Sequence, residues 1–269
     1  MRFAALGDTG DDSAMEYAVA KALAAKCAQS GCDEVLLLGD DIYPQGPASV
    51  TDPAFDNAIT KPFAPVNSEF WLTLGNHDYG GGNAGAGTDL WKGPIWVQWA
   101  ATQTKFILPA TSYDRVDGNV HFFALDSNLM NQGQGAAQIA EWQAKMTAPE
   151  AGWKIAFAHH PYLSNGDHGN ATGGVLAGYD ALVCGHVDLF LDGHDHSMQW
   201  LQPTAKCGGT EFIVSGAGAE HTGLSGSNPA YYQSASTYGF FWVEINGNNL
   251  HGEFIDQNGN VLFTRDRAR

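Results

Sequence analysis

The segment Val187-Asp188-Leu189-Phe190-Leu191-Asp192-Gly193-His194-Asp195-His196 joins an apolar run to two histidines. Residues 187–191 predict a buried strand, because short apolar runs that end at glycine and polar residues are typical of strands in a core. Alternate residues of an extended chain point to the same side, so His194 and His196 could hold one metal ion. A single His-x-His pair is also common in plain turns, so the rest of the chain has to supply further ligands.

The same pattern occurs four more times upstream. Each apolar run predicts a strand and ends on Asp, Asn or His: 3–6 before Gly7-Asp8, 35–38 before Gly39-Asp40, 70–74 before Gly75-Asn76-His77-Asp78, and 154–158 before His159-His160. Polar residues that follow strands of an α/β sheet converge at one edge, which is where ligands bind. The pattern therefore predicts one shared site.

The intervening segments predict helices and further strands. A helix should begin after Asp12 or Ser13, and two more are expected near 90–101 and 136–147, the first with Trp91, Ile95 and Trp99 in the core. Strands are also expected at 120–125 and 212–215, and a hairpin at 240–255. No repeat or linker separates these segments, so we expect one mixed α/β domain over residues 1–269.

The polar residues at the strand ends form a mixed donor set. Oxygen would come from Asp8, Asp40 and Asn76, and nitrogen from His159, His194 and His196. Oxygen and nitrogen together suit Fe, Mn or Zn better than Ca or Mg. Six ligands are too many for one open catalytic ion but suffice for two ions about 3.5–4 Å apart, bridged by a carboxylate such as that of Asp40.

The ordered motifs resemble a known enzyme family. They are Gly7-Asp8-Thr9-Gly10, Gly39-Asp40-Asp41-Ile42-Tyr43, Gly75-Asn76-His77-Asp78, Ala156-Phe157-Ala158-His159 and Gly193-His194-Asp195-His196. Together they look like the five signature motifs of calcineurin-like metallophosphoesterases and, more narrowly, of the small, animal-type (tartrate-resistant-like) purple acid phosphatases. The resemblance implies a four-layer αββα sandwich of two mixed β-sheets flanked by helices.

The resemblance also implies a role for each ligand. Asp8, Asp40, Tyr43 and His196 would hold Fe(III), and Asp40, Asn76, His159 and His194 would hold a divalent ion, Fe, Zn or Mn. Tyr43 separates purple acid phosphatases from other metallophosphoesterases, although a tyrosine followed by Pro44 could simply pack beneath its loop. A phenolate and two carboxylates are the hard oxygen donors that a trivalent ion favours.

Further histidines extend the predicted site. His77 should face the substrate, with Asp78 beside it to orient it, and His168 matches a second active-site histidine of the small enzymes. His160 departs from the family pattern, which often has an aromatic residue there, and it either faces the pocket or fills the neighbour's place. His121, His186, His221 and His251 have no motif around them and are expected in the scaffold.

The expected activity is hydrolysis of phosphate monoesters by in-line attack of a metal-activated hydroxide. His77 or His168 would protonate the leaving group, which implies an acid pH optimum. The substrates would be small phosphate esters, with a phosphoprotein or a nucleotide as further options. Two alternatives are a Mn- or Fe-dependent phosphodiesterase with a structural Tyr43, and a non-catalytic module that binds metal or phosphate.

Charge and cysteines bear on partners and location. The net charge of −16 argues against nucleic acid polymers and anionic membranes as partners. The four cysteines fit two disulfides, such as Cys27–Cys32 and Cys184–Cys207, about as well as four buried thiols. The sequence carries no signal peptide, and the family's habit implies a secreted or periplasmic protein, which we expect to be a monomer.

Overall fold

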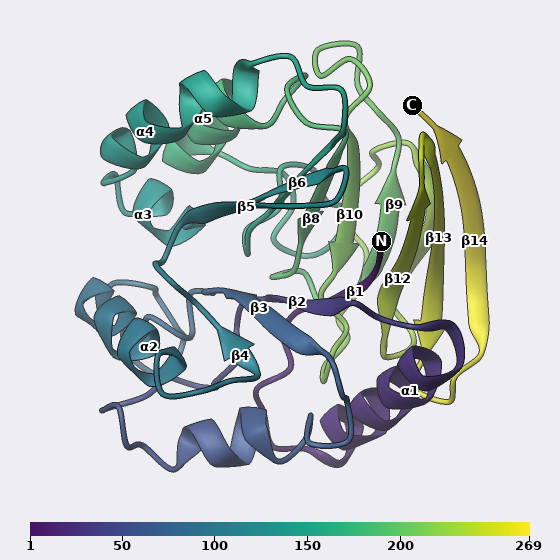
Figure 1. The fold of residues 1–269 in the computed structure, drawn as a ribbon. Helices are drawn as coiled ribbons and strands as arrows, with labels where there is room; N and C mark the ends of the chain where they lie inside the picture. Colours follow the sequence, from purple (N-terminus) through teal and green to yellow (C-terminus); the bar gives the residue numbers. More distant parts are fainter.

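The computed structural model describes residues 1–269 and contains two seven-stranded mixed sheets that pack against each other (Figure 1). The first sheet has the strand order β14-β13-β12-β1-β2-β3-β4, and the second has the order β11-β9-β10-β8-β7-β6-β5. The strands of the first sheet are β1 (Arg2–Leu6), β2 (Glu34–Leu38), β3 (Glu69–Thr73), β4 (Phe106–Ile107), β12 (Gly239–Asn246), β13 (Asn249–Asp256) and β14 (Val261–Ala268). Those of the second are β5 (Tyr113–Asp117), β6 (Val120–Ala124), β7 (Trp153–Phe157), β8 (Leu189–Asp192), β9 (Met198–Leu201), β10 (Glu211–Ser215) and β11 (Ala230–Ser234).

Helices lie on the outer sides of the two sheets. Figure 1 shows α3, α4 and α5 beside the second sheet, and α1 and α2 beside the first. Their bounds are α1 (Ala14–Ser30), α2 (Gly93–Ala100), α3 (Ser127–Asn131), α4 (Ala136–Thr147) and α5 (Gly173–Leu182), with a short π-helix at Asp56–Thr60 and a 3-10 turn at Leu90–Lys92. This arrangement confirms the predicted sandwich of two mixed sheets flanked by helices. No helix has both the length and the apolarity that a bilayer span requires.

Aromatic rings from the two sheets meet in the core between them. The ring of Phe3 in β1 lies 5.5 Å from that of Phe122 in β6, and Trp200 in β9 lies 5.2 Å from Phe241 in β12. All four side chains are buried. Burial of such rings supplies much of the free energy that holds two sheets together. A second, smaller cluster packs α4 and α5 onto the outer face of the second sheet.

Parallel strands bring their polar ends to one place. β1 pairs in parallel with β2, and β2 with β3, while β7 pairs in parallel with β8 in the other sheet. The two sheets meet at these ends, where the amide of Gly7 donates to the carbonyl of Ser215. Loops from both sheets therefore border one site. The predicted strands and helices correspond to elements of the structure within a few residues at each end.

The helix near residues 90–101 buries a different set of residues from the predicted one. Trp91 is 59% exposed, so its expected place in the core is wrong, whereas Trp99 is buried. The buried partner of Trp99 is Trp96, and Phe55 stacks on Trp99 at 4.2 Å. The physical reason is the 3-10 turn at Leu90–Lys92, which precedes α2 and breaks the 3.6-residue period counted from Trp91.

Both candidate disulfides are present. Cys27 is bonded to Cys32 and Cys184 to Cys207, and no cysteine is free. The first bridge closes the end of α1 onto the loop before β2, and the second ties the end of α5 to the loop before β10. The sequence left open whether the four cysteines form two disulfides or remain thiols, and in the structure they form two disulfides.

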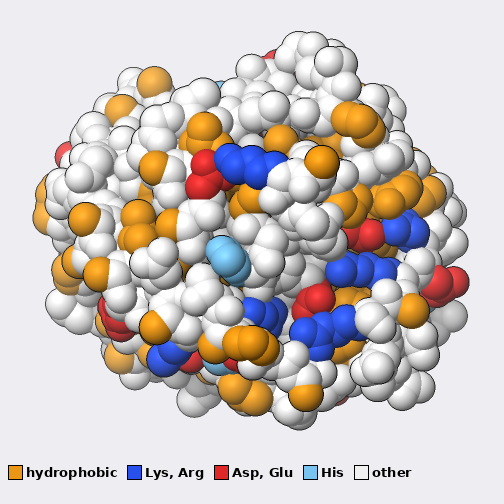
Figure 2. All heavy atoms as spheres, turned by 90° about the horizontal axis from the view of Figure 1, so that it is seen from above, with side chains coloured by type: hydrophobic (Ala, Val, Ile, Leu, Met, Phe, Trp, Pro, Cys, Tyr) orange, Lys and Arg blue, Asp and Glu red, His pale blue; other side chains and the backbone are white.

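The face where the chain ends carries basic and acidic side chains side by side. Figure 2 shows this face, with Lys and Arg lying among Asp and Glu rather than forming a uniform basic patch. Arg267 and Arg269 both contact the carboxylate of Asp188, and Arg269 also donates to the carbonyl of Glu150. These cations are engaged in closing the C-terminal strand onto the second sheet.

Glu16 is a buried acid in the first turn of α1. Ser13 caps this helix and accepts a hydrogen bond from the Glu16 amide, but both carboxyl oxygens of Glu16 are buried without a partner. Burial, together with the nearby Asp11 carboxylate, raises the pKa of Glu16 to about 9. At neutral pH the folded chain therefore keeps a proton on Glu16 that the unfolded chain has released.

We expect Glu16→Gln to raise the free energy of unfolding by about 3 kcal/mol at pH 7, because glutamine is neutral without binding a proton. The gain should vanish below pH 4.5, the ordinary pKa, and should grow with pH up to about pH 9, the pKa in the folded chain. Urea unfolding of both proteins at pH 4, 7 and 9 measures it, with the exposed Glu141→Gln as a control that should change little. A gain that is equal at pH 4 and pH 7 would contradict the assignment.

Candidate metal centre

Seven side chains converge where the two sheets meet, and we call them the donor cluster. They follow five different strands: Asp8 after β1, Asp40 and Tyr43 after β2, Asn76 after β3, His159 after β7, and His194 and His196 after β8. Asp8, Asp40 and His194 have φ of 58°, 55° and 66°. Non-glycine residues rarely adopt this left-handed conformation, and it persists mainly where the surrounding structure enforces it, often at functional sites.

Four side chains form the first half of the cluster. The hydroxyl oxygen of Tyr43 lies 3.2 Å from Oδ1 of Asp8, 3.2 Å from Oδ2 of Asp40 and 3.3 Å from Nε2 of His196. Nε2 of His196 lies 3.4 Å from Oδ1 of Asp8. Three oxygens and one nitrogen thus surround one point.

The second half shares Asp40 with the first. Nε2 of His159 lies 3.3 Å from Oδ2 of Asp40, 2.9 Å from Oδ1 of Asn76 and 3.1 Å from Nδ1 of His194. Asp40, His159 and His194 are also close enough together to ligate one ion. Oδ2 of Asp40 is therefore the atom common to both halves.

The spacing of these atoms fits metal coordination. Ligand atoms about 2.1 Å from a common ion, at angles of about 90–110°, lie about 3.0–3.4 Å from one another. The separations within each half agree with that range to about 0.1 Å. The donor cluster thus has the geometry and the chemistry to hold two ions bridged by a carboxylate.

The protonation of Asp40 and His159 reflects their mutual contact. Burial opposes ionisation of Asp40, but the His159 and His77 rings outweigh it and lower its pKa to about 2. Burial likewise disfavours the charged form of His159, yet the Asp40 carboxylate raises its pKa to about 9. The Nδ1–H of His159 donates to the carbonyl of Leu38 at 2.9 Å. The second proton of the charged ring is therefore on Nε2, and a metal ion that binds Nε2 would displace it.

The other ring donors differ in charge. Burial and the surrounding rings of His160, His159, His168 and His196 lower the pKa of His194 well below its usual value, so its lone pair is available to a metal. Burial disfavours the charged form of His196, but the hydrogen bond to Asp8 raises its pKa to about 9. Burial and the carboxylates of Asp40 and Asp8 raise the pKa of Tyr43 well above 10.

Asp78 holds two of the donor loops together. Its carboxylate accepts hydrogen bonds from the amides of Asp40, Asp41, Ile42 and Gly75 at 2.7–3.0 Å. The expected contact between Asp78 and the His77 ring is absent, because both carboxylate oxygens point at the backbone. Gly75 is required here, since a Cβ at this position would overlap Oδ1 of Asp40.

The two candidate catalytic histidines lie beside the donor cluster. His77 is half-buried, and its Nδ1–H donates to the carbonyl of Pro44 at 2.8 Å, which leaves Nε2 free. Its ring lies 4.4 Å from that of Tyr43. His168 stacks on His194 at 4.0 Å, and its amide donates to Oδ1 of Asp195 at 2.8 Å. The structure thus brings both histidines to the site, one near each half of the cluster.

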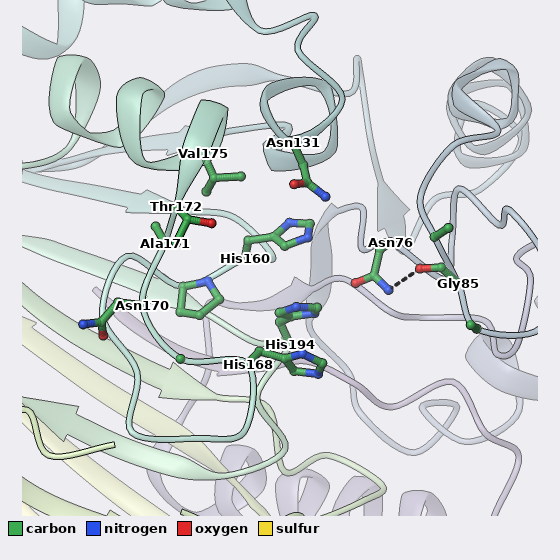
Figure 3. Close-up of a pocket in the computed structure, with 14 residues that line it drawn as sticks. Asn76, Gly85, Asn131, His160, His168, Asn170, Ala171, Thr172, Val175 and His194 are labelled. Carbon is green, nitrogen blue, oxygen red and sulfur yellow. Dashed lines mark hydrogen bonds between the residues drawn. The ribbon is translucent and has the colours of Figure 1, made fainter. Parts of the chain in front are cut away.

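His160 faces the pocket beside the cluster (Figure 3). Its Nδ1 is 2.8 Å from the hydroxyl of Ser127, and its ring lies 4.5 Å from that of His194. Burial and the His159 ring lower the pKa of His160 to about 3. Of the two roles that the sequence left open for it, the structure supports the first.

The remaining histidines lie outside the cluster, but one neighbour reaches it. His121 contacts Asp114 and Glu150 at the surface, and His221 packs on Tyr238. Glu220, which the sequence analysis missed, places Oε2 3.2 Å from Nδ1 of His196. No local pattern marks Glu220, since it follows a loop far from the histidine in sequence.

The family model of the calcineurin-like phosphoesterases matches residues 1–198, which include the whole donor cluster. The chain belongs to the calcineurin-like phosphoesterase family. The curated relatives of this phosphoesterase confirm the narrower resemblance as well. It is 26% identical over 249 residues to purple acid phosphatase 3 of Arabidopsis thaliana, covering 86% of this chain and 67% of that one. It is also 26% identical over 300 residues to tartrate-resistant acid phosphatase type 5 of Mus musculus, covering 100% and 90%.

Solved structures share the fold of this phosphoesterase. GAP50 of Plasmodium, described as the anchor in the inner membrane complex, superposes with a TM-score of 0.79 at 19% identity, covering 100% of this chain and 88% of that one. Purple acid phosphatase PPD1 from yellow lupin seeds superposes with a TM-score of 0.77 at 17% identity, covering 100% and 54%. These likenesses show that the two-sheet sandwich is common to all three proteins.

Proposed function

We propose that this phosphoesterase is a binuclear metal-dependent acid phosphatase that hydrolyses phosphate monoesters. The observation that carries the proposal is the division of the donor cluster into two halves that share one oxygen, Oδ2 of Asp40. Two-ion sites of this kind clamp both the attacking and the leaving oxygen in an in-line displacement. Membership of the phosphoesterase family supports the same conclusion.

The two halves suit different ions. Asp8, Asp40, Tyr43 and His196 would hold Fe(III), because a phenolate and two carboxylates supply the negative charge that a trivalent ion favours. Burial and the carboxylates of Asp40 and Asp8 raise the pKa of Tyr43, so its phenolate would form only with a strongly positive ion bound beside it. Asp40, Asn76, His159 and His194 would hold Fe, Zn or Mn as a divalent ion.

The reaction then depends on charge and on a proton donor. When bound, the two ions would neutralise the phosphate oxygens and activate a water for in-line attack on phosphorus. His77, held through Nδ1 by the Pro44 carbonyl, would offer a proton on Nε2 to the leaving oxygen. His168 is the second candidate for that role, and the contact between its amide and Asp195 positions its loop. Because an imidazolium is the donor, activity should be higher at acid pH.

The basic test is hydrolysis by purified protein loaded with iron and zinc. Metal analysis should give two ions per chain, and phenyl phosphate should be hydrolysed faster at pH 5 than at pH 8. Diphenyl phosphate should be cleaved about 100-fold more slowly or worse, because a monoester presents more charge to the two ions. Preference for the diester would favour a phosphodiesterase, and metal-loaded protein that binds phosphate without cleaving any ester would favour a non-catalytic module.

His77→Ala should slow alkyl phosphates more than p-nitrophenyl phosphate. An alkoxide needs a proton as it leaves, whereas p-nitrophenolate is stable without one, so we expect a loss of about 100-fold on glycerol 3-phosphate and only a few-fold on p-nitrophenyl phosphate. Turnover of both substrates by the same metal-loaded preparation measures the difference. His121→Ala is the matched control, because His121 lies away from the cluster. Equal losses on both substrates would remove His77 as the acid.

The domain and location are also proposals. We treat residues 1–269 as one catalytic domain, supported by the antiparallel pairing of β12 with β1, which joins both ends of the chain in one sheet. The two disulfides support a secreted or periplasmic protein, because such bonds persist in oxidising compartments. We propose that it acts as a monomer on small phosphate esters, with phosphoproteins or nucleotides as further options.

A further inference from the structure

A pocket of about 360 Å³ opens directly beside the divalent half of the donor cluster (Figure 3). It shares Asn76 and His194 with that half, and it is also lined by His168. An ester whose phosphorus lay at the two ions would therefore extend its alcohol part into this pocket. The volume lies at the small end of the range of about 300–1,000 Å³ that is usual for small-molecule sites.

The walls of the pocket lack the acidic and basic residues that are frequent elsewhere in the chain. None of the 14 lining residues is Lys, Arg, Asp or Glu, although the chain as a whole has 29 acidic residues. A second phosphate or a carboxylate on the substrate would meet no Lys or Arg side chain here, and an ammonium group would meet no carboxylate. Burying such a charge without a partner is unfavourable, so the pocket suits an uncharged group.

The walls do offer unused hydrogen-bonding groups. The Asn131 amide and the Thr172 hydroxyl have no partner in the chain, and Thr172 does not cap α5 although it precedes that helix. Ser127 binds Nδ1 of His160, so Nε2 remains for the pocket. Figure 3 shows these groups along the upper part of the pocket, with Asn131 above the His160 ring and the Thr172 hydroxyl directed toward the side on which both lie. Groups that both donate and accept suit hydroxyls.

The apolar part of the lining argues against an aromatic ligand. It consists of small aliphatic residues such as Ala84, Ala86, Ala171 and Val175, without Phe, Tyr or Trp. A nucleobase would therefore find no Phe, Tyr or Trp ring to stack on, and the aromatic rings of the lining are the smaller imidazoles of His160, His168 and His194.

We propose that this pocket selects phosphate monoesters of small, uncharged, hydroxyl-rich alcohols, such as sugar or polyol monophosphates. Asn131, His160 and Thr172 are the specificity-determining residues, because they bind the hydroxyls of the alcohol part. The inference rests on the proposed phosphatase function and names its substrate class.

The test compares substrates and a nearly isosteric variant. Metal-loaded protein is assayed on glucose 6-phosphate, fructose 1,6-bisphosphate, adenosine 5′-monophosphate and phenyl phosphate. The wild-type kcat/KM should be higher for glucose 6-phosphate than for the bisphosphate or the nucleotide. Asn131→Leu should lower kcat/KM about tenfold for glucose 6-phosphate, since it removes the hydrogen bonds to hydroxyls, and less than twofold for phenyl phosphate. The matched control is Asn248→Leu, an exposed asparagine in the turn between β12 and β13.

The outcomes separate this inference from the proposed function. If wild-type protein with two ions leaves phenyl phosphate intact, the phosphatase function itself is wrong. If phenyl phosphate is hydrolysed but Asn131→Leu affects both esters alike, or neither, the pocket does not select hydroxylated alcohols. Preference for the bisphosphate or the nucleotide would overturn the inference in the same way. A selective tenfold loss, repeated in Thr172→Val, supports it.

Discussion

Asp40→Asn is expected to lower kcat/KM for phenyl phosphate by about a thousandfold or more and to reduce the metal content from two ions to one or none. Asp40 is the only side chain that belongs to both halves of the donor cluster, with Oδ2 3.2 Å from the Tyr43 hydroxyl and 3.3 Å from His159. A neutral amide cannot supply the negative charge that two bridged cations need. Its oxygen can still accept the hydrogen bond from the His77 amide, so the loop should keep its shape.

The neighbouring residue gives a matched control for this substitution. Asp41 is also fully buried, but its carboxylate has no hydrogen-bond partner and lies outside the cluster. Burial and the carboxylates of Asp78 and Asp40 raise its pKa well above the usual value, which favours the neutral form that asparagine mimics. Asp41→Asn should therefore keep both ions and most of the activity. Metal content and kcat/KM are measured on the two variants after identical preparation. Retention of both ions in Asp40→Asn would show that Asp40 does not bridge them.

Most of the donor cluster could be foreseen from sequence because its residues lie shortly after the ends of five strands. Asp8, Asp40 and Asn76 follow apolar runs through a glycine, so the strand pattern and the parallel topology together place them at one edge. The sheets themselves were predictable for the same reason, since continuous apolar runs are typical of strands that are buried on both faces.

The supporting residues could not be foreseen, because their partners are distant in the sequence. Asp78 was expected beside His77, yet it binds amides 36 to 38 residues away at 40–42. The contact between His160 and Ser127 depends on α3, a short helix without a periodic pattern. Trp91 was misplaced because a 3-10 turn changes the helical phase locally, and no residue type marks that change. Local sequence patterns therefore identify the metal-donor residues. The residues that support them are set by tertiary contacts, which no local pattern shows.

Charge links the site to the rest of the molecule. The chain carries a net charge of −16, which repels a phosphate dianion from most of its surface. In the donor cluster without metal, the two carboxylates are balanced by His159 and His196, whose pKa is raised to about 9, so the cluster has no net positive charge to attract phosphate. Five positive charges from Fe(III) and a divalent ion would exceed the three negative charges of Asp8, Asp40 and the Tyr43 phenolate. The site then attracts phosphate only when it is loaded, which ties substrate binding to the presence of both ions.

Tyr43→Phe is expected to abolish the visible absorption of the iron-loaded protein while the fold stays intact. A phenolate bound to Fe(III) absorbs visible light, and Tyr43 is the tyrosine whose hydroxyl lies within 3.2–3.3 Å of Asp8, Asp40 and His196. Phenylalanine keeps the ring contact with His77 but removes the oxygen. Because three donors of that half remain, we expect activity to fall only about tenfold, far less than for Asp40→Asn.

The spectrum must be compared at equal iron content, because loss of iron would also remove the colour. Tyr17→Phe, which changes an exposed tyrosine of α1, is the matched control and should leave the band unchanged. A band that survives in Tyr43→Phe would place the chromophore elsewhere. A colourless wild-type protein that holds two ions and is active would mean that Tyr43 is structural, and it would move the chain from the purple acid phosphatases to the general metallophosphoesterases. Burial and the carboxylates of Asp40 and Asp8 raise the pKa of Tyr43, so a phenolate band at acid pH would itself require a strongly charged ion close to the Tyr43 oxygen.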